Sequence, residues 1–186
     1  MISRYLTFGV LLTAMTVQAQ TKDQSAVKPE LLNHIYFVGD SNQLTSLEKN
    51  KAAMVTKMKL AGFGGSSSSY SVDGNSSSMR LNKSQPEFAL KMSDMMDPSN
   101  YIRLYKFKTK GKEREATISG VGAMGTKPKI DGEGISFVVK SPATGVYILV
   151  PEKPLEAGEY GFINMMMTSQ SGKNISYTVF AFGIDR

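Results

Sequence analysis

Apolar residues between positions 34 and 184 of this 186-residue chain occur in short runs, and turn-forming residues separate one run from the next. Val, Ile, Phe and Tyr are frequent within the runs, whereas Gly, Pro, Asn, Asp and Ser fill the intervals. Runs that recur every 8 to 15 residues, roughly, are typical of β-strands, and almost no long segment repeats at the helical spacing. We therefore predict an all-β protein, an antiparallel β-sandwich of the Greek-key, immunoglobulin-like type with about nine or ten short strands and at most one short helix.

Three segments add detail to this prediction. Residues 47–60 contain the helix formers Glu, Lys and Ala, but positions 54–60 alternate between apolar and polar as a strand does. We favour a strand over 53–60. Residues 92–100, which include Asp97 and Pro98, predict a helical turn. In the last segment, 175–184, apolar side chains leave both faces, which is typical of a central strand.

The most specific local motif is Leu155-Glu156-Ala157-Gly158-Glu159-Tyr160. It resembles the tyrosine corner of Greek-key sandwiches, Leu-x-Pro-Gly-x-Tyr, although an alanine stands where the proline usually does. The resemblance implies that Leu155 packs beneath a bend, that Gly158 permits the bend, and that the Tyr160 hydroxyl bonds to backbone upstream. It therefore implies a fold and no activity.

The first nineteen residues carry a different pattern. Arg4 precedes an apolar run from Tyr5 to Val17, and Val17 and Ala19 place small residues at −3 and −1 of a cleavage site. The run is shorter than the roughly 18 to 20 residues that span a bilayer. We expect a cleaved export signal over 1–19, a disordered lead over 20–30 and a single domain over 31–186. After cleavage no transmembrane segment is expected.

Composition narrows the compartment and the partners. The chain has no cysteine, so it cannot be a lipoprotein anchored after the cleavage site, and it folds without disulfides. Periplasm and cell exterior both remain open, as does the oligomeric state. The formal net charge is +6. Because an exported protein rarely meets nucleic acid, we expect no nucleic-acid partner, and an anionic glycan or a protein surface is the more accessible one.

Several chemistries lack the residues they need. With a single histidine, His34, and no cysteine, the chain offers no zinc or imidazole-rich copper site, and no G-x-S-x-G elbow accompanies a serine nucleophile. The sequence Gly120-Val121-Gly122-Ala123-Met124-Gly125 fits G-x-G-x-x-G, but Pro and Gly residues follow it where a nucleotide site needs a helix. We expect no cofactor and no catalytic residue.

Carboxylate pairs keep one enzymatic alternative open. Glu113 with Glu115, and Asp131 with Glu133, would each point to one face of an extended segment. Glycosidases use two carboxylates that can come from distant strands. A small hydrolase acting on envelope or extracellular carbohydrate is therefore the first alternative, while solvated strand ends would produce the same pattern.

Methionines gather in two places, at positions 92, 95 and 96 and at positions 165–167, among twelve in the chain. Thioether sulfur is a soft ligand, so a Cu(I)-binding periplasmic protein is the second alternative. This reading requires Met92 or Met95 to lie near Met165 or Met167. Methionine also fills irregular cores and adaptable binding surfaces, which is the more common use.

The segment 101–114 is the best candidate for a ligand-binding surface. If it is extended, Arg103, Tyr105 and Phe107 share one face, and Lys106 and Lys108 share the other. Aromatic rings beside cations can stack on sugars or hold an anionic glycan. The competing interpretation is that the lysines protect an exposed sheet edge from pairing with other chains. Taken together, the sequence predicts an exported, non-catalytic binding module for a glycan or a protein surface.

Overall fold

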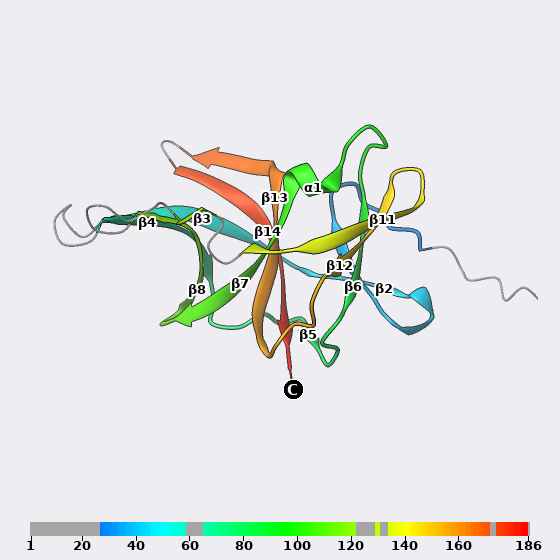
Figure 1. Ribbon diagram of the computed structural model, residues 1–186, viewed down its shortest axis with the longest axis horizontal. Coiled ribbons are helices and arrows are strands. Elements are labelled where there is room, and N and C mark those ends of the chain that lie inside the picture. The colour runs from blue at the N-terminus through cyan, green and yellow to red at the C-terminus, as the bar shows by residue number, and fades with distance from the viewer. Residues whose placement is uncertain (1–26, 59–64, 122–128, 131–133, 172–173, 186) are drawn as a thin grey trace, which may run out of the picture.

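A computed structural model describes residues 27–58, 65–121, 129–130, 134–171 and 174–185. The described chain is almost entirely antiparallel β-structure, which confirms the all-β part of the predicted fold class (Figure 1). Its elements are β1 (Ile35–Val38), a 3-10 turn (Asp40–Asn42), β2 (Leu44–Ser46), β3 (Glu48–Met58), β4 (Ser66–Asp73), β5 (Arg80–Leu81), β6 (Glu87–Lys91), α1 (Pro98–Tyr101), β7 (Ile102–Lys110), β8 (Glu113–Val121), β9 (Lys129–Ile130), β10 (Gly134–Ile135), β11 (Phe137–Ala143), β12 (Val146–Pro151), β13 (Gly158–Ser171) and β14 (Asn174–Ile184).

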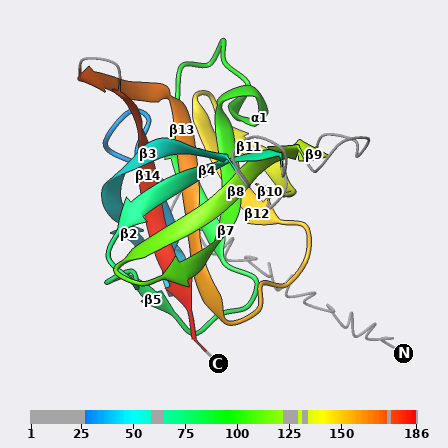
Figure 2. The ribbon, with the colours of Figure 1, turned by 90° about the vertical axis from the view of Figure 1, so that its left-hand side faces the viewer.

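Six strands close into a barrel in the order β7-β13-β14-β3-β4-β8, where β8 pairs again with β7. Figure 2 shows these strands wrapping around one another at one end of the molecule. The sequence predicted a sandwich of two open sheets, and it did not predict that one sheet closes into a barrel. A barrel needs strands that tilt and shift in register until the last one meets the first, and hydrophobic periodicity does not report tilt.

A second, five-stranded sheet in the order β11-β12-β6-β1-β2 packs on the outer wall of the barrel. The core between the two layers is rich in aromatic rings. Phe88 on β6 lies 4.9 Å from Phe162 on β13 and 4.7 Å from Phe182 on β14, measured between ring centroids. All three side chains are fully buried, so this cluster joins the layers.

The interior of the barrel holds a separate apolar cluster. Tyr70 lies edge-on to Tyr105 and to Tyr177, and Val179 and Ala181 pack beside them. Space is tight on this side of β13, because a Cβ at Gly161 would come within 2.8 Å of Val179 Cγ1. Alternate residues of β7, β13 and β14 therefore point into the barrel and into the interlayer core, so these strands are apolar on both faces.

Within the ambiguous segment 47–60, residues Glu48–Met58 form the strand β3, which begins five residues before the predicted 53–60, while residues 59 and 60 lie outside the described residues. The helical turn forms at Pro98–Tyr101, and β14 is a central strand between β13 and β3. The predicted export signal, most of the disordered lead, most of the glycine motif, and Asp131 and Glu133 lie outside the described residues. Within the described residues, no helix is long and apolar enough to cross a membrane.

One end of the barrel is sealed by a buried charge network. Arg114 on β8 is 2% exposed, and its guanidinium lies 3.3 Å from Glu48 Oε1 and 3.3 Å from Glu159 Oε2. The segment after β4 closes over the network, because the backbone N–H of Ser77 donates to Glu159 Oε2 at 2.7 Å. Arg80 adds ion pairs to Glu159 and Asp185. Buried charges persist in proteins when they are paired and hydrogen-bonded in this way.

This network predicts an acid-sensitive contribution to stability. Burial alone would raise the pKa of Glu48, but hydrogen bonds donated by Asn50, Ser77 and Ser78 outweigh burial and lower the pKa from 4.5 to about 2. A carboxylate whose pKa is lower in the folded state than in the unfolded state stabilises the fold. This stabilisation is complete at pH values above the unfolded-state pKa, and it is lost as the pH falls to the folded-state pKa. We expect Glu48→Gln to flatten the fall in unfolding free energy between pH 4.5 and about pH 2, as measured by urea titration at several pH values.

Glu30 supplies the control, because its exposed carboxyl lies outside the network. Glu30→Gln should leave the pH profile parallel to that of the unaltered protein. Parallel profiles for Glu48→Gln and the unaltered protein would show that Glu48 does not carry the acid sensitivity.

Candidate functional site

Three adjoining hollows form a groove along one side of the molecule, where the chain passes from the barrel to the five-stranded sheet. The lysine hollow, of about 310 Å³, and the middle hollow, of about 360 Å³, share Gly134 and Ile135. The methionine hollow, of about 600 Å³, shares Ser99 and Phe137 with the middle one. We call the three together the side groove. Its lining residues are Asp94, Met95, Met96, Asp97, Pro98, Ser99, Ile102, Arg103, Leu104, Lys106, Lys108, Gly134, Ile135, Ser136, Phe137, Val139, Ser141, Tyr147 and Glu152.

The groove follows from how β10 and β11 pair. Ile135 on β10 pairs with Leu104 on β7 in the barrel sheet, and two residues later Phe137 on β11 pairs with Pro151 on β12 in the other sheet. The chain therefore crosses the open side of the interlayer core. Ile135, Phe137 and Val139 pack against that core while remaining partly exposed, so the floor of the groove is apolar.

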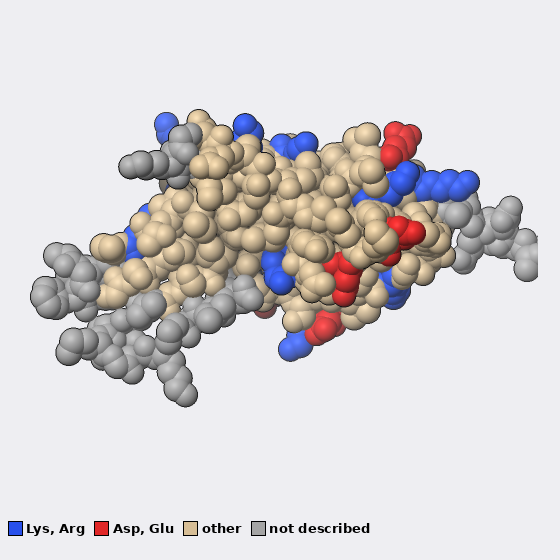
Figure 3. All heavy atoms as spheres, turned by 90° about the horizontal axis from the view of Figure 1, so that it is seen from above, with Lys and Arg blue, Asp and Glu red and all other residues tan. Residues whose placement is uncertain are grey.

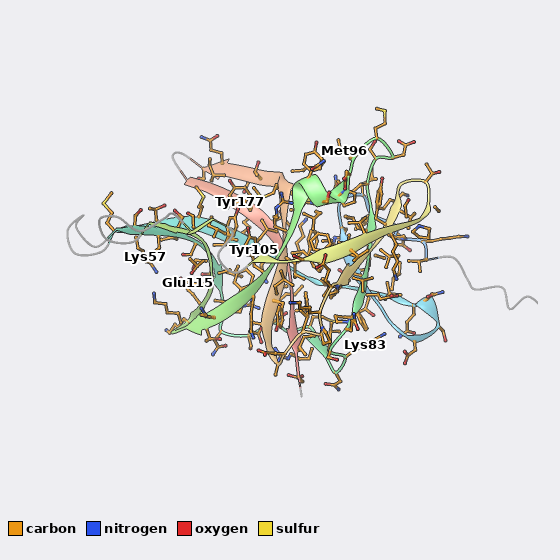
Figure 4. All side chains as sticks on the ribbon, viewed as in Figure 1. Lys57, Lys83, Met96, Tyr105, Glu115 and Tyr177 are labelled. Carbon is orange, nitrogen blue, oxygen red and sulfur yellow. The ribbon has the colours of Figure 1, made fainter. Side chains whose placement is uncertain are left out.

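The opposite wall of the methionine hollow is the short segment that leads into α1. Asp97 caps this helix, because its Oδ1 accepts a hydrogen bond from Ser99 N at 2.8 Å, and Pro98 occupies the first helical turn. The same hydrogen bonding lowers the pKa of Asp97, so its carboxylate is ionised at neutral pH. Met95 is 91% exposed and Met96 is partly buried beside the helix (Figure 4).

The predicted ligand-binding residues of β7 divide between the barrel interior and the groove. Tyr105 and Phe107 are 3% and 5% exposed and belong to the cluster inside the barrel. Their rings are therefore not available to stack on a surface sugar, contrary to the expectation from the sequence. Arg103 lines the middle hollow, and Lys106 and Lys108 line the lysine hollow. The predicted alternation along β7 is present, but the face that carries Tyr105 and Phe107 lies inside the barrel, whereas Lys106 and Lys108 reach the surface.

Charges of both signs surround the groove. Lys106 Nζ lies 2.9 Å from Glu156 Oε2, and the hydrogen bond between them raises the pKa of Lys106. Two lysines line one end of the groove, Arg103 and Glu152 line the middle, and Asp94 and Asp97 line the other end. Figure 3 shows the acidic side chains of the upper face gathered on the half that holds the five-stranded sheet.

The segment that resembles a tyrosine corner lies beside the lysine end. The Tyr160 hydroxyl donates to the carbonyl of Glu156 at 2.8 Å, and the Lys106 ammonium lies 5.8 Å from the centre of the Tyr160 ring. Leu155 is buried in the interlayer core, and Gly158 has a positive φ of 155°. Burial raises the pKa of Tyr160, so its hydroxyl keeps its proton for the bond. The structural contacts that the resemblance implies are thus present in this segment.

Of the carboxylates proposed as catalytic pairs, the two that the structure describes, Glu113 and Glu115, have partners of their own. Glu113 accepts a hydrogen bond from Ser71, and Glu115 on β8 pairs with Lys57 on β3 and Lys110 on β7 (Figure 4). The hydrogen bond from Lys57 lowers the pKa of Glu115 although partial burial opposes it. A carboxylate held ionised by two lysines does not supply the proton that a glycosidase acid must donate.

The two groups of methionines line different hollows, although Met92, Met96, Met166 and Met167 all pack in or against the interlayer core. Met95 and Met96 line the methionine hollow, whereas Met167 lines another hollow of about 530 Å³ together with Lys49 and Lys51 of β3 and residues of β13 and β14. The sulfur of Met165 accepts a hydrogen bond from the Tyr70 hydroxyl at 3.7 Å. Met92 is buried in the interlayer core. Packing and surface contacts account for these positions without a metal.

His34 also has structural contacts. Its Nε2 lies 2.6 Å from Ser46 Oγ, and its ring lies 4.8 Å from the rings of Tyr36 and Phe180. Burial, followed by the nearby charge of Lys49, lowers its pKa. His34 lines none of the three hollows of the side groove.

Sequence reasoning missed most of the groove, because its walls come from three separated segments, 94–108, 134–141 and 147–152. The signal that could have found it is the alternation of Ile135, Phe137 and Val139 with more exposed residues, together with the adjacent methionines Met95 and Met96, of which Met95 is exposed. No family model, curated protein or solved structure matches this chain.

Proposed function

We propose that this chain is an exported, non-catalytic binding module that holds a partner protein in the side groove. The observation that carries the proposal is the groove itself, which has an apolar floor and charges of both signs along its rim. Protein interfaces combine these features, with an apolar centre and a polar border. Met95 and Met96 suit such a surface, because methionine side chains adapt to partners of different shape.

A protein partner is favoured over a glycan by where the aromatic rings lie. Sugar binding relies on rings that present a face to solvent, and Tyr105 and Phe107 are enclosed in the barrel. In the groove, Phe137 packs against the interlayer core and Tyr147 is 9% exposed, with its hydroxyl bound to the Met96 carbonyl at 3.0 Å. The exposed lining of the methionine hollow thus combines thioether and aliphatic groups with the polar groups of its Asp and Ser residues.

Site-specific photo-crosslinking tests this proposal in the full chain, expressed in its native cells. Met95 is replaced by the photoreactive residue benzoylphenylalanine, and the matched control carries the same residue at Met58, which is 79% exposed on β3 at the far end of the barrel. We expect a discrete adduct from position 95 that yields peptides of a second protein by mass spectrometry, and no adduct of that mass from position 58.

The alternatives give different results. An adduct whose added mass is removed by glycosidases, and which yields no peptides of a second protein, would assign the groove to a glycan. Equal adducts from both positions, or no adduct from position 95, would contradict a binding role for the groove. Both variants should be as stable as the unaltered protein, because both methionine side chains are largely exposed.

A further inference from the structure

The side groove runs along a strand whose outer edge is open. β11 ends the five-stranded sheet, and within the described residues it pairs only with β12. The opposite edge strand of that sheet, β2, is only three residues long. An exposed edge presents backbone N–H and C=O groups that can pair with another extended chain.

The hydrogen-bond register identifies which groups of β11 point outwards. Glu152 N donates to the carbonyl of Ser136 at 3.1 Å, which makes this opposed pair a hydrogen-bonded one. Hydrogen-bonded pairs alternate with non-hydrogen-bonded pairs in an antiparallel ladder. The pair Val138 with Val150 is therefore hydrogen-bonded, whereas Phe137 and Val139 direct their backbone groups away from β12.

Proline placement agrees with this register. Pro151 has no N–H. It stands opposite Phe137 in a non-hydrogen-bonded pair, where the pairing of β11 with β12 needs no N–H from β12. Further along β11, the register shifts between Lys140 and Ala143, and Pro142 lies within the shift. Charge, a bulge and a proline are devices that block edge pairing. They protect the end of β11 and leave Phe137 to Val139 open.

The open stretch lies where the groove can hold side chains. Phe137 and Val139 both line the methionine hollow, so a strand added beside them would direct alternate side chains into it. Along the chain direction from Gly134 to Ser141, the lining charge changes from Lys106 in the lysine hollow to Asp94 and Asp97 in the methionine hollow. The groove therefore complements a segment whose two ends carry opposite charges.

We propose that the side groove takes an extended segment of a partner protein, which adds to the free edge of β11 as an antiparallel strand. This inference rests on the proposed function and specifies its mode of recognition. Because the added strand runs opposite to β11, its basic residue lies towards its N-terminal end, facing Asp94 and Asp97. Its acidic residue lies towards its C-terminal end, facing Arg103 and Lys106. Main-chain bonds supply affinity and the hollows supply specificity.

Amide hydrogen exchange of the full chain, resolved by residue, tests the open edge first. In the free protein the amides of Phe137 and Val139 should exchange fast, and those of Val138 and Lys140 should exchange slowly because they bond to β12. The probe is then a peptide selected on the full chain from a displayed library of random 12-residue sequences. Its binding should slow the amides of Phe137 and Val139 and leave the other two unchanged.

Two variants make the test specific. Val139→Pro removes an N–H that points away from β12 and leaves the hydrogen bonds to β12 in place. It should lower the affinity for the selected peptide about tenfold. Asp94→Lys should weaken a peptide that carries a basic residue by about two- to fivefold, and a peptide with Glu at that position should regain the loss. Circular dichroism verifies that Val139→Pro is folded. If this variant does not fold, the test is whether the selected peptide slows exchange of the Phe137 and Val139 amides in the unaltered protein.

Each remaining outcome overturns the inference in a distinguishable way. Selected peptides that leave the amides of Phe137 and Val139 exchanging fast would exclude strand addition, while crosslinking at Met95 would still report on the proposed function. A selection that enriches no peptide would also exclude it. If the amides of Phe137 and Val139 become protected without peptide as the protein concentration rises, and the mass in solution doubles, a second copy of the chain occupies the edge.

Discussion

Arg114→Met is expected to lower the free energy of unfolding by about 3 to 5 kcal/mol. The guanidinium is 2% exposed and pairs with Glu48 and Glu159, and it also donates to the carbonyls of Gly74 and Asp73 at 3.1 and 3.4 Å. Removing it leaves two carboxylates without their shared cation at the sealed end of the barrel. Methionine replaces most of the apolar stem, so the loss reports charge and not volume. Urea unfolding at neutral pH measures it.

An exposed ion pair provides the matched control. Lys140 Nζ lies 3.6 Å from Glu87 Oε1, with 61% and 43% of the two side chains exposed. Lys140→Met should change stability by less than about 1 kcal/mol. In the triple variant Arg114→Met, Glu48→Gln, Glu159→Gln, part of the loss should return because the unpaired charges are gone. A loss for Arg114→Met no greater than that for Lys140→Met would mean that the network contributes no net stability.

Phe88→Ala is expected to cost about 3 to 5 kcal/mol, because it opens a cavity in the core between the layers. Phe88 is fully buried, and its ring contacts Phe162 and Phe182 of the barrel wall. Since β6 shares these contacts with β13 and β14, we expect sheet and barrel to unfold together. Thermal unfolding should therefore give one transition at a lower temperature when far-ultraviolet and tyrosine near-ultraviolet circular dichroism are compared.

The neighbouring strand offers a control of the same residue type. Phe37 on β1 stands opposite Phe88 in the register and is only partly buried, with its ring 6.3 Å away. Phe37→Ala should cost clearly less than Phe88→Ala. Two separate transitions in Phe88→Ala would indicate that the sheet and the barrel are independent units, contrary to the shared cluster.

Sequence patterns predicted strands well where local chemistry decides the structure. The two-sided apolar pattern of β14 indicated a central strand, and Pro98 after Asp97 indicated the helical turn. The patterns predicted exposure poorly where a second layer decides it. Tyr105 and Phe107 alternate with basic residues as the exposed face of an edge strand would, but that face is the inside of a closed barrel.

The candidate site was only partly predictable for the same reason. Arg103, Lys106 and Lys108 were identified from β7 alone, and they do line the groove. The other wall depends on β10 and β11 belonging to different sheets, which follows from long-range pairing and not from periodicity.

The seam that closes the barrel has a consequence for the order in which the chain assembles. β7 and β8 meet through three registered pairs next to a two-residue turn at Gly111, whose φ is +64°. β14 and β3, in contrast, pair between segments that lie more than a hundred positions apart in the sequence. A local hairpin forms in microseconds, whereas distant strands must first bear the entropy of closing a long loop. The β7–β8 pairing that closes the barrel can thus form early in folding. The pairing of β14 with β3 is the slow step that limits the folding rate.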